Sequence, residues 1–208
     1  MKNRVNKFLV TGGFSLKHRR GFKSGDFYYY NGMRATFEKA LLFIQKPGRA
    51  LDIGAGFGNE TKELLKRGFD VVATDVNSDA VKYLKKLARK THYTRTVLEV
   101  DEMGLPEIPE GRFDFIVCEM VLHFLDEDGA LNSIQKIQDA TEKGGINAIS
   151  SYTESKSIRE DPRLTGYFNY LLPPEKLKKL YKNWEILYYE EKSNIMGHPS
   201  ARLIARKK

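Results

Sequence analysis

The stretch that most constrains the fold of this 208-residue chain is Leu51–Thr61, LDIGAGFGNET. The apolar run just before its glycines has the character of a short buried strand, and residues 59–68 carry apolar side chains at helical spacing. Between them, Gly54, Gly56 and Gly58 allow a tight turn and a close approach of the backbone to a ligand. A strand, a glycine turn and a helix in this order are typical of the ligand loop of an open α/β sheet.

The rest of the chain continues this alternation. A helix is predicted over 33–45, and further segments alternate as strands 49–54, 69–75, 94–101, 113–122 and 146–152 and helices 59–68, 77–90, 126–141 and 173–182. Residues 142–145 predict a turn, 153–172 are irregular, and 184–192 with 201–207 predict a closing hairpin. We therefore expect an α/β fold: a Rossmann-like, seven-stranded, mostly parallel sheet with an antiparallel last strand and helices on both faces.

Composition is that of a soluble globular protein, with 41% hydrophobic and 30% charged residues. No apolar run approaches the length of a membrane span, and the N-terminus lacks the apolar core of a signal peptide. The single cysteine, Cys118, excludes an intramolecular disulfide framework and offers no zinc-site spacing, so no metal is expected. A cytoplasmic protein is the expectation.

The net charge of +8 is concentrated at the N-terminus. Residues 1–25 hold seven basic and no acidic residues, whereas the other 183 residues nearly balance 28 basic against 27 acidic side chains. We expect 1–25 to be a basic N-terminal arm and 26–208 to be a single domain. Such an arm suits contact with nucleic acid or another polyanion, and a solvated chain terminus is the alternative.

The glycine spacing distinguishes between ligands. A dinucleotide-binding loop has the pattern G-x-G-x-x-G, but here the third glycine position of that pattern is Asn59. Asp52 stands two residues before the first glycine, where a carboxylate favours a ligand with an ammonium group over one with phosphates. Asp75 and Asp101 end the next two predicted strands, where they suit ribose hydroxyls and an adenine amino group. Singly each aspartate fits a turn or a helix cap, but jointly they favour an adenosine-containing ligand.

These motifs resemble those of the class I S-adenosylmethionine-dependent methyltransferases, in the order LDIGAGFGNET, VVATDVN, VDEMGLP, FDFIVCEMVLHFLDED and EKGGINAIS. The resemblance implies S-adenosyl-L-methionine as the cofactor. It places a methionine-binding loop on Gly54, Ala55, Gly56 and Gly58, ordered by Asp52, and ribose and adenine contacts on Asp75, Val76, Asp101, Glu102 and Met103. From their positions in the chain, Glu119 after the fourth strand and Tyr30 in the segment before the first helix are further candidates for the pocket.

A narrower resemblance concerns the C-terminal quarter. GYFNYLLPPEKLKKLYKNWEILYYEE and the terminal ARKK resemble the tellurite-resistance methyltransferase family. That family carries a histidine followed by an arginine between its last two strands, whereas here His198 is followed by Pro199. The missing cation weighs against an oxyanion substrate, and the long basic N-terminus is a second departure from the family.

Methyl transfer from an activated sulfonium needs mainly alignment in a site that excludes water. We expect a methyltransferase acting on a small-molecule acceptor, such as a thiol or a metalloid oxyanion, which needs no base. Where a base is used, His123 after the fourth strand and His198 at the start of the last strand are the catalytic candidates. Packing at a helix start and a surface loop are their structural alternatives. The segment DFYYYN (26–31) is a candidate lid over the pocket.

Three other functions are alternatives. A methyltransferase acting on RNA or another polyanion would use the basic arm, but the Asn-Pro-Pro-aromatic motif of base amino-group methylation is absent. A non-catalytic cofactor-binding module is opposed by the intact glycine and aspartate positions, and a nicotinamide oxidoreductase by the glycine spacing. The sequence does not specify the acceptor, the use of a general base or the oligomeric state.

Overall fold

A computed structural model of the chain describes residues 35–90, 96–162, 164, 166, 168–193 and 197–208. Its strands are β1 (Arg49–Ile53), β2 (Asp70–Thr74), β3 (Leu98–Asp101), β4 (Phe113–Glu119), β5 (Thr141–Tyr152), β6 (Glu185–Ser193) and β7 (Pro199–Arg206). Its α-helices are α2 (Ala35–Ala40), α3 (Asn59–Lys66), α4 (Ser78–Lys90), α5 (Glu127–Ala140), α6 (Lys156–Arg159) and α7 (Lys176–Leu180). Two short 3-10 helices are η2 (Leu41–Phe43) and η3 (Leu122–Phe124).

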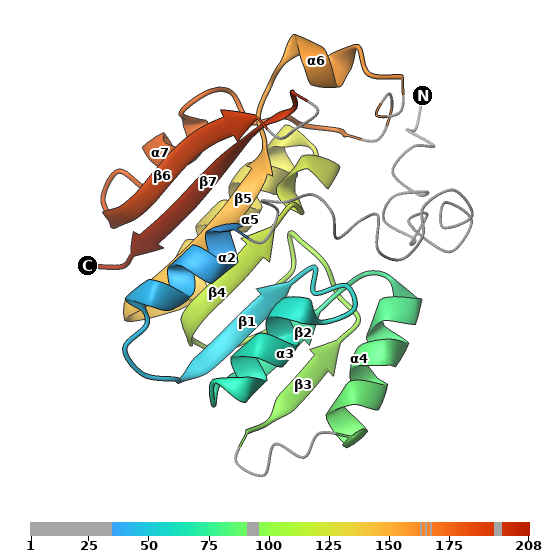
Figure 1. Cartoon of the computed structure of the whole chain (residues 1–208), viewed down its shortest axis with the longest axis vertical. Helices are drawn as coiled ribbons and strands as arrows, with labels where there is room; N and C mark the ends of the chain where they lie inside the picture. The colour runs from blue at the N-terminus through green and yellow to red at the C-terminus, as the bar shows by residue number, and fades with distance from the viewer. Residues whose placement is uncertain (1–34, 91–95, 163, 165, 167, 194–196) are drawn as a thin grey trace.

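All seven strands form one sheet in the order β3-β2-β1-β4-β5-β7-β6 (Figure 1). The pairs among β1 to β5 are parallel, and β7 runs antiparallel to both β5 and β6. Strand β6 therefore points the same way as β1 to β5. The expected seven-stranded, mostly parallel sheet with an antiparallel last strand is confirmed.

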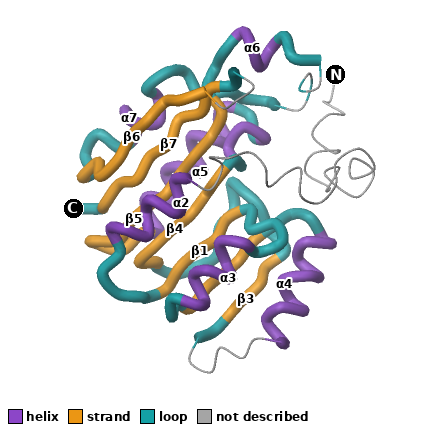
Figure 2. The backbone as a smooth tube through the Cα atoms, in the orientation of Figure 1, coloured by secondary structure: helices purple, strands orange, loops and turns teal. Residues whose placement is uncertain are grey.

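Helices cover both faces of the sheet, as Figure 2 shows for the helical and strand layers. Helices α2 and α3 cross the near face, where Phe37 and Leu64 pack on a core that includes Val117. Helix α5 lies behind the sheet, where Ile134 packs on a second core that includes Ile116. Because successive strand residues face opposite sides, alternate apolar residues of β4 supply the two cores.

Local signals in the sequence set several helix ends. Asp126 caps α5, since its Oδ1 accepts a 2.8 Å hydrogen bond from the backbone N–H of Gly129. Asn77 caps α4 through a 2.9 Å hydrogen bond from the N–H of Asp79. Gly68 has a φ of 90° one residue past the cap of α3, the left-handed conformation that favours glycine after a helix.

Several boundaries differ from the sequence-based expectation, among them the start of α7 at Lys176 rather than at residue 173 and the following three. Strand β4 ends at Glu119 rather than at residue 122, because Met120 adopts a φ of 58° and η3 follows. Residues 142–145, expected as a turn, belong to β5, where they form an insertion in the pairing with β4. Residues 153–172, expected to be irregular, contain the short helix α6.

The strand order fixes where a ligand loop lies. The carboxyl ends of β1 to β6 share one edge of the sheet, and the β6–β7 hairpin turns at that same edge. Loops after β1, β2 and β4 meet there, next to the change of direction in the strand order at β1. No helix in the described part of the chain has the length and apolar character that crossing a membrane requires.

Candidate cofactor site

The glycine loop joins β1 to α3 with three glycines in the left-handed region. Gly54, Gly56 and Gly58 have φ values of 69°, 54° and 70°. A Cβ on Gly54 would lie 2.5 Å from a methyl group of Val121, and one on Gly58 would lie 2.7 Å from Leu84. A Cβ on Gly56 would meet no atom of the described residues within 4 Å. Gly54 and Gly58 thus serve close packing, whereas Gly56 borders open space that a ligand can enter.

The loops after β1 and β2 are tied together at Asp75. Its Oδ2 accepts a 2.8 Å hydrogen bond from the N–H of Gly56, and its Oδ1 accepts one of 2.8 Å from the N–H of Asn77. Burial raises the pKa of Asp75, and these backbone donors partly offset that effect. Each carboxylate oxygen keeps a second lone pair, so Asp75 can accept further hydrogen bonds from a ligand.

Asp52 lies beneath the glycine loop and is buried. Its Oδ2 accepts a 2.5 Å hydrogen bond from the hydroxyl of Thr61 on α3. Burial first, and then the negative charge of Glu60, raises the pKa of Asp52 to about 8. This contact ties the end of β1 to the first turn of α3, and the loop-ordering role that the resemblance implies for Asp52 stays a prediction.

The residues expected around an adenine ring gather beside Asp75. The backbone N–H of Asp75 donates a 3.3 Å hydrogen bond to the carbonyl of Asp101 at the end of β3. Val76 is 38% exposed, and Glu102 is exposed with Met103 half-buried after it. A Cβ on Gly104 would lie 2.2 Å from a methyl group of Val76, so this turn closes around the Val76 side chain. The structure therefore brings these residues to one place at the edge of the sheet.

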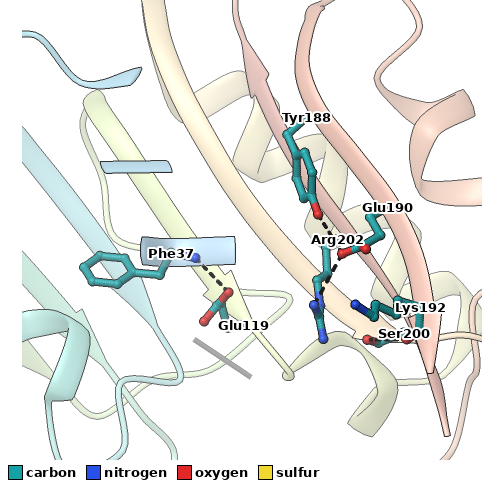
Figure 3. Close-up of polar contacts among 7 residues, drawn as sticks. All are labelled: Phe37, Glu119, Tyr188, Glu190, Lys192, Ser200 and Arg202. Atoms are coloured by element: carbon teal, nitrogen blue, oxygen red, sulfur yellow. Dashed lines mark hydrogen bonds and ion pairs between the residues drawn. The ribbon is translucent and has the colours of Figure 1, made fainter. Parts of the chain in front are cut away.

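Glu119 ends β4 on the opposite side of the glycine loop. Its Oε1 accepts a 3.0 Å hydrogen bond from the N–H of Phe37 in α2 (Figure 3). Burial, and next the charge of Glu60, raises the pKa of Glu119 to about 8. Its side chain thus contributes a hydrogen-bonding group with a raised pKa to this edge.

His123 is buried in η3 among aromatic rings. Its ring centroid lies 4.3 Å from Phe124, 5.0 Å from Tyr152 and 4.6 Å from Phe168. Its Nδ1 is 3.3 Å from the hydroxyl of Ser151. Burial lowers the pKa of His123 to about 3, so the imidazole is neutral at pH 7. These contacts describe a packed side chain, and its catalytic role stays a prediction.

His198 is buried too, rather than exposed in a surface loop. Its Nε2 lies 3.1 Å from Oδ2 of Asp161, and the two side chains are 4% and 7% exposed. The ring of Tyr152 lies 6.4 Å from His198 and 5.0 Å from His123, so one tyrosine touches both histidines. The sequence analysis did not single out Asp161, because its irregular segment gave no sign of which strand it would meet.

The N-terminal candidates lie outside the described residues, whereas Cys118 lies in the core of the sheet. Tyr30, the segment 26–31 and the basic arm 1–25 belong to the undescribed residues 1–34. Cys118 is fully buried in β4, and burial raises the pKa of its thiol, as expected of a core cysteine. Among the described residues, no group of three histidine, cysteine or carboxylate side chains is arranged to hold a metal ion.

This sheet, with its glycine loop after β1 and aspartate after β2, is the class I methyltransferase fold. The family model of the tellurite resistance protein TehB matches residues 23–200, and the chain belongs to that family. The suspected resemblance to S-adenosylmethionine-dependent methyltransferases of the tellurite-resistance family is therefore confirmed.

Individual relatives agree. The chain is 28% identical over 175 residues to a "Probable S-adenosyl-L-methionine-dependent methyltransferase TehB" of Haemophilus influenzae, covering 79% of this chain and 59% of the relative. It thus spans about three fifths of that relative's length. The crystal structure of TehB from Haemophilus influenzae superposes with a TM-score of 0.68 at 25% identity, covering 84% of this chain and 62% of that one.

A more distant structure shares the fold. It is the 1,6-didemethyltoxoflavin-N1-methyltransferase of Burkholderia thailandensis, solved with bound S-adenosylhomocysteine, with a TM-score of 0.73 at 17% identity. The match covers 96% of this chain and 88% of that one. At this identity the likeness concerns the fold alone.

Proposed function

We propose that this protein transfers the methyl group of S-adenosyl-L-methionine to a small-molecule acceptor. The observation that carries the proposal is the hydrogen bond between Asp75 and the N–H of Gly56, which places a carboxylate beside the open space at the glycine loop. Family membership supports the reaction class, since the Haemophilus influenzae relatives are named as methyltransferases that depend on this cofactor.

The residues at the edge fit the cofactor chemically. Asp75 offers free lone pairs to ribose hydroxyls, and the exposed side chain of Val76 offers an apolar surface to adenine. The open space at Gly56 suits the methionine moiety, while Asp101, Glu102 and Met103 would border the base. When bound, the cofactor supplies an electrophilic methyl group on a sulfonium. The protein contributes binding, alignment and exclusion of water.

The acceptor would approach between the ends of β4, β5 and β7. A thiol or a metalloid oxyanion remains a candidate acceptor because such a nucleophile needs no base. If a base is used, His198 is the better of the two histidines, since Asp161 holds its Nε2 and so fixes the orientation of the ring.

The proposal is tested by methyl transfer from isotopically labelled S-adenosyl-L-methionine to a panel of thiols, metalloid oxyanions, small amines and tRNA. We expect label in at least one small molecule and none in tRNA. Label only in tRNA would move the activity to the alternative, a polyanion methyltransferase. His198→Ala should lower turnover on the labelled acceptor by about tenfold or more while affinity for S-adenosylhomocysteine stays unchanged.

A further inference from the structure

A row of polar residues crosses four strands at the ligand edge of the sheet. Glu119 of β4 pairs with Ser150 of β5, Ser150 pairs with Arg202 of β7, and Arg202 pairs with Glu190 of β6. Side chains at paired positions stand on the same face of a sheet, about 5 Å apart. The four side chains are therefore neighbours, although they come from four separate parts of the chain.

The row lies on the face that α2 covers. Each member of the row on β4, β5 and β7 has an apolar residue two positions away on the same face. These residues are Val117, Ala148 and Ile204, and all three belong to the core beneath α2. Because Ile53 pairs with Cys118, the first residue of the glycine loop comes next to Glu119. The apolar layer thus ends in a polar row that runs from the glycine loop to β6, the outermost strand on this side of the sheet.

Two members of the row have hydrogen-bonding groups that the described residues leave unused. The hydroxyl of Ser150 is buried and has no hydrogen-bond partner in the described part of the chain. The Arg202 side chain is only 12% exposed, and within the described residues its polar contact is a 3.5 Å approach to Oε2 of Glu190 (Figure 3). A guanidinium has five N–H donors, and leaving buried donors unmatched is costly.

The charges around the row favour an anion. The hydroxyl of Tyr188 donates a 2.6 Å hydrogen bond to Glu190 and lowers the pKa of this carboxyl, so Glu190 stays charged and partly offsets Arg202. Lys39 of α2 lies 3.6 Å from the centroid of the Tyr188 ring, and Lys192 follows two residues after Glu190 on the same face. Even with Glu119 counted as charged, the three cations Arg202, Lys39 and Lys192 outnumber the two carboxylates here.

We propose that Arg202 and Ser150 form the specificity site for the methyl acceptor and bind a carboxylate group that the acceptor carries. This inference rests on the proposed function, which it deepens by naming the acceptor class. A guanidinium matches a carboxylate with two parallel hydrogen bonds, and the Ser150 hydroxyl adds a third donor. Glu119 stands between this site and the glycine loop, where the methyl group is expected.

The test uses the full chain saturated with S-adenosylhomocysteine. Acetate, benzoate, benzyl alcohol and inorganic phosphate are each titrated into it at constant ionic strength, and ligand-observed NMR measures their binding. We expect benzoate to bind at least about tenfold more tightly than benzyl alcohol. Arg202→Gln should weaken benzoate binding about tenfold or more, and Ser150→Ala by about threefold to tenfold. Arg202→Lys should fall between wild type and Arg202→Gln, because an ammonium cannot make the paired contact.

Arg206→Gln is the matched control. Arg206 lies on the same strand, toward the opposite end from the proposed site, and forms a 2.9 Å ion pair with the exposed Glu185. The Arg206→Gln variant should therefore bind benzoate as tightly as the wild-type protein. Three results would each overturn the proposal. They are benzoate binding no tighter than that of benzyl alcohol, wild-type affinity for benzoate in both Arg202→Gln and Arg202→Lys, and binding of phosphate without binding of carboxylates. If S-adenosylhomocysteine itself does not bind, the proposed function fails, and the same titration of the protein alone still decides whether the carboxylate site exists.

Discussion

The carboxylate of Asp75 and the backbone N–H of Gly56 lie 2.8 Å apart as a hydrogen-bonded pair. The pair joins the loop after β2 to the loop after β1, at the edge where the carboxyl ends of both strands meet. It holds the carboxylate beside the open side of Gly56, where a Cβ would meet none of the described residues within 4 Å. The two motifs, which are 19 residues apart in the sequence, thus lie side by side in the fold.

Asp75→Ala should weaken binding of S-adenosylhomocysteine by about 1–3 kcal/mol, because ribose hydroxyls lose their acceptor and the glycine loop loses a hydrogen bond. Isothermal titration calorimetry measures the change. Asp79→Ala is the control, since Asp79 is half-exposed in the first turn of α4 and its ion pair with Lys82 is long, at 3.8 Å. Equal affinities for the two variants would mean that Asp75 only shapes its turn.

Gly56→Ala and Gly144→Ala form a second matched pair. Both glycines have positive φ values, 54° and 80°, and at both a Cβ would have no neighbour within 4 Å in the described part of the chain. Each substitution should therefore lower the free energy of unfolding by a similar amount, about 1 kcal/mol, through backbone strain alone. Only Gly56→Ala should reduce affinity for S-adenosylhomocysteine, by about tenfold or more, because its methyl group fills the ligand space. Unaltered affinity in Gly56→Ala would show that the space is not used.

The pH dependence of stability should report on His123. Its pKa is about 3 in the folded protein and near 6.5 when unfolded. As pH falls below about 6.5, the unfolded chain binds a proton that the folded protein does not, so this group makes the protein less stable with falling pH. His123→Gln should reduce the slope by about 1 kcal/mol per pH unit between pH 6 and pH 4. Denaturant unfolding of both proteins gives the difference, and parallel curves would contradict a buried neutral His123.

Removal of residues 1–23 should leave affinity for S-adenosylhomocysteine unchanged, because the expected cofactor residues lie from Tyr30 onward. If the arm contacts a polyanion, the truncated protein should bind RNA more weakly and with a flatter dependence on salt. Filter binding across a salt series measures both quantities. Full-length protein that shows no salt-dependent RNA binding would eliminate the polyanion alternative.

Much of the fold was readable because local patterns and tertiary packing agree. The segment predicted as a strand over 146–152 puts Ile146 and Ala148 in the core beneath α2, and the helix predicted over 126–141 forms as α5 with Asp126 as its cap. The end of β4 was misjudged because the sequence stays apolar beyond Glu119. Only the backbone shows the break there, where Met120 takes a positive φ that its side chain does not signal.

Part of the candidate site could be predicted from the sequence, because some of its residues are marked by local patterns. Asp75 follows directly from a strand end, whereas the row containing Ser150 and Arg202 depends on the register between strands distant in sequence. The sequence offered one signal, since Ser150 and Arg202 continue the alternation of Ala148 and Ile204 on one face. It offered none for the pairing of His198 with Asp161, because that contact depends on how an irregular segment folds back.

Calorimetric titration of the full chain at pH 7 shows whether the edge that holds Asp75 and Gly56 binds S-adenosyl-L-methionine. We predict saturable binding of S-adenosyl-L-methionine and S-adenosylhomocysteine with one site per chain, and no binding of NAD. Micromolar binding of NAD with no response to either sulfur-containing ligand would contradict the account.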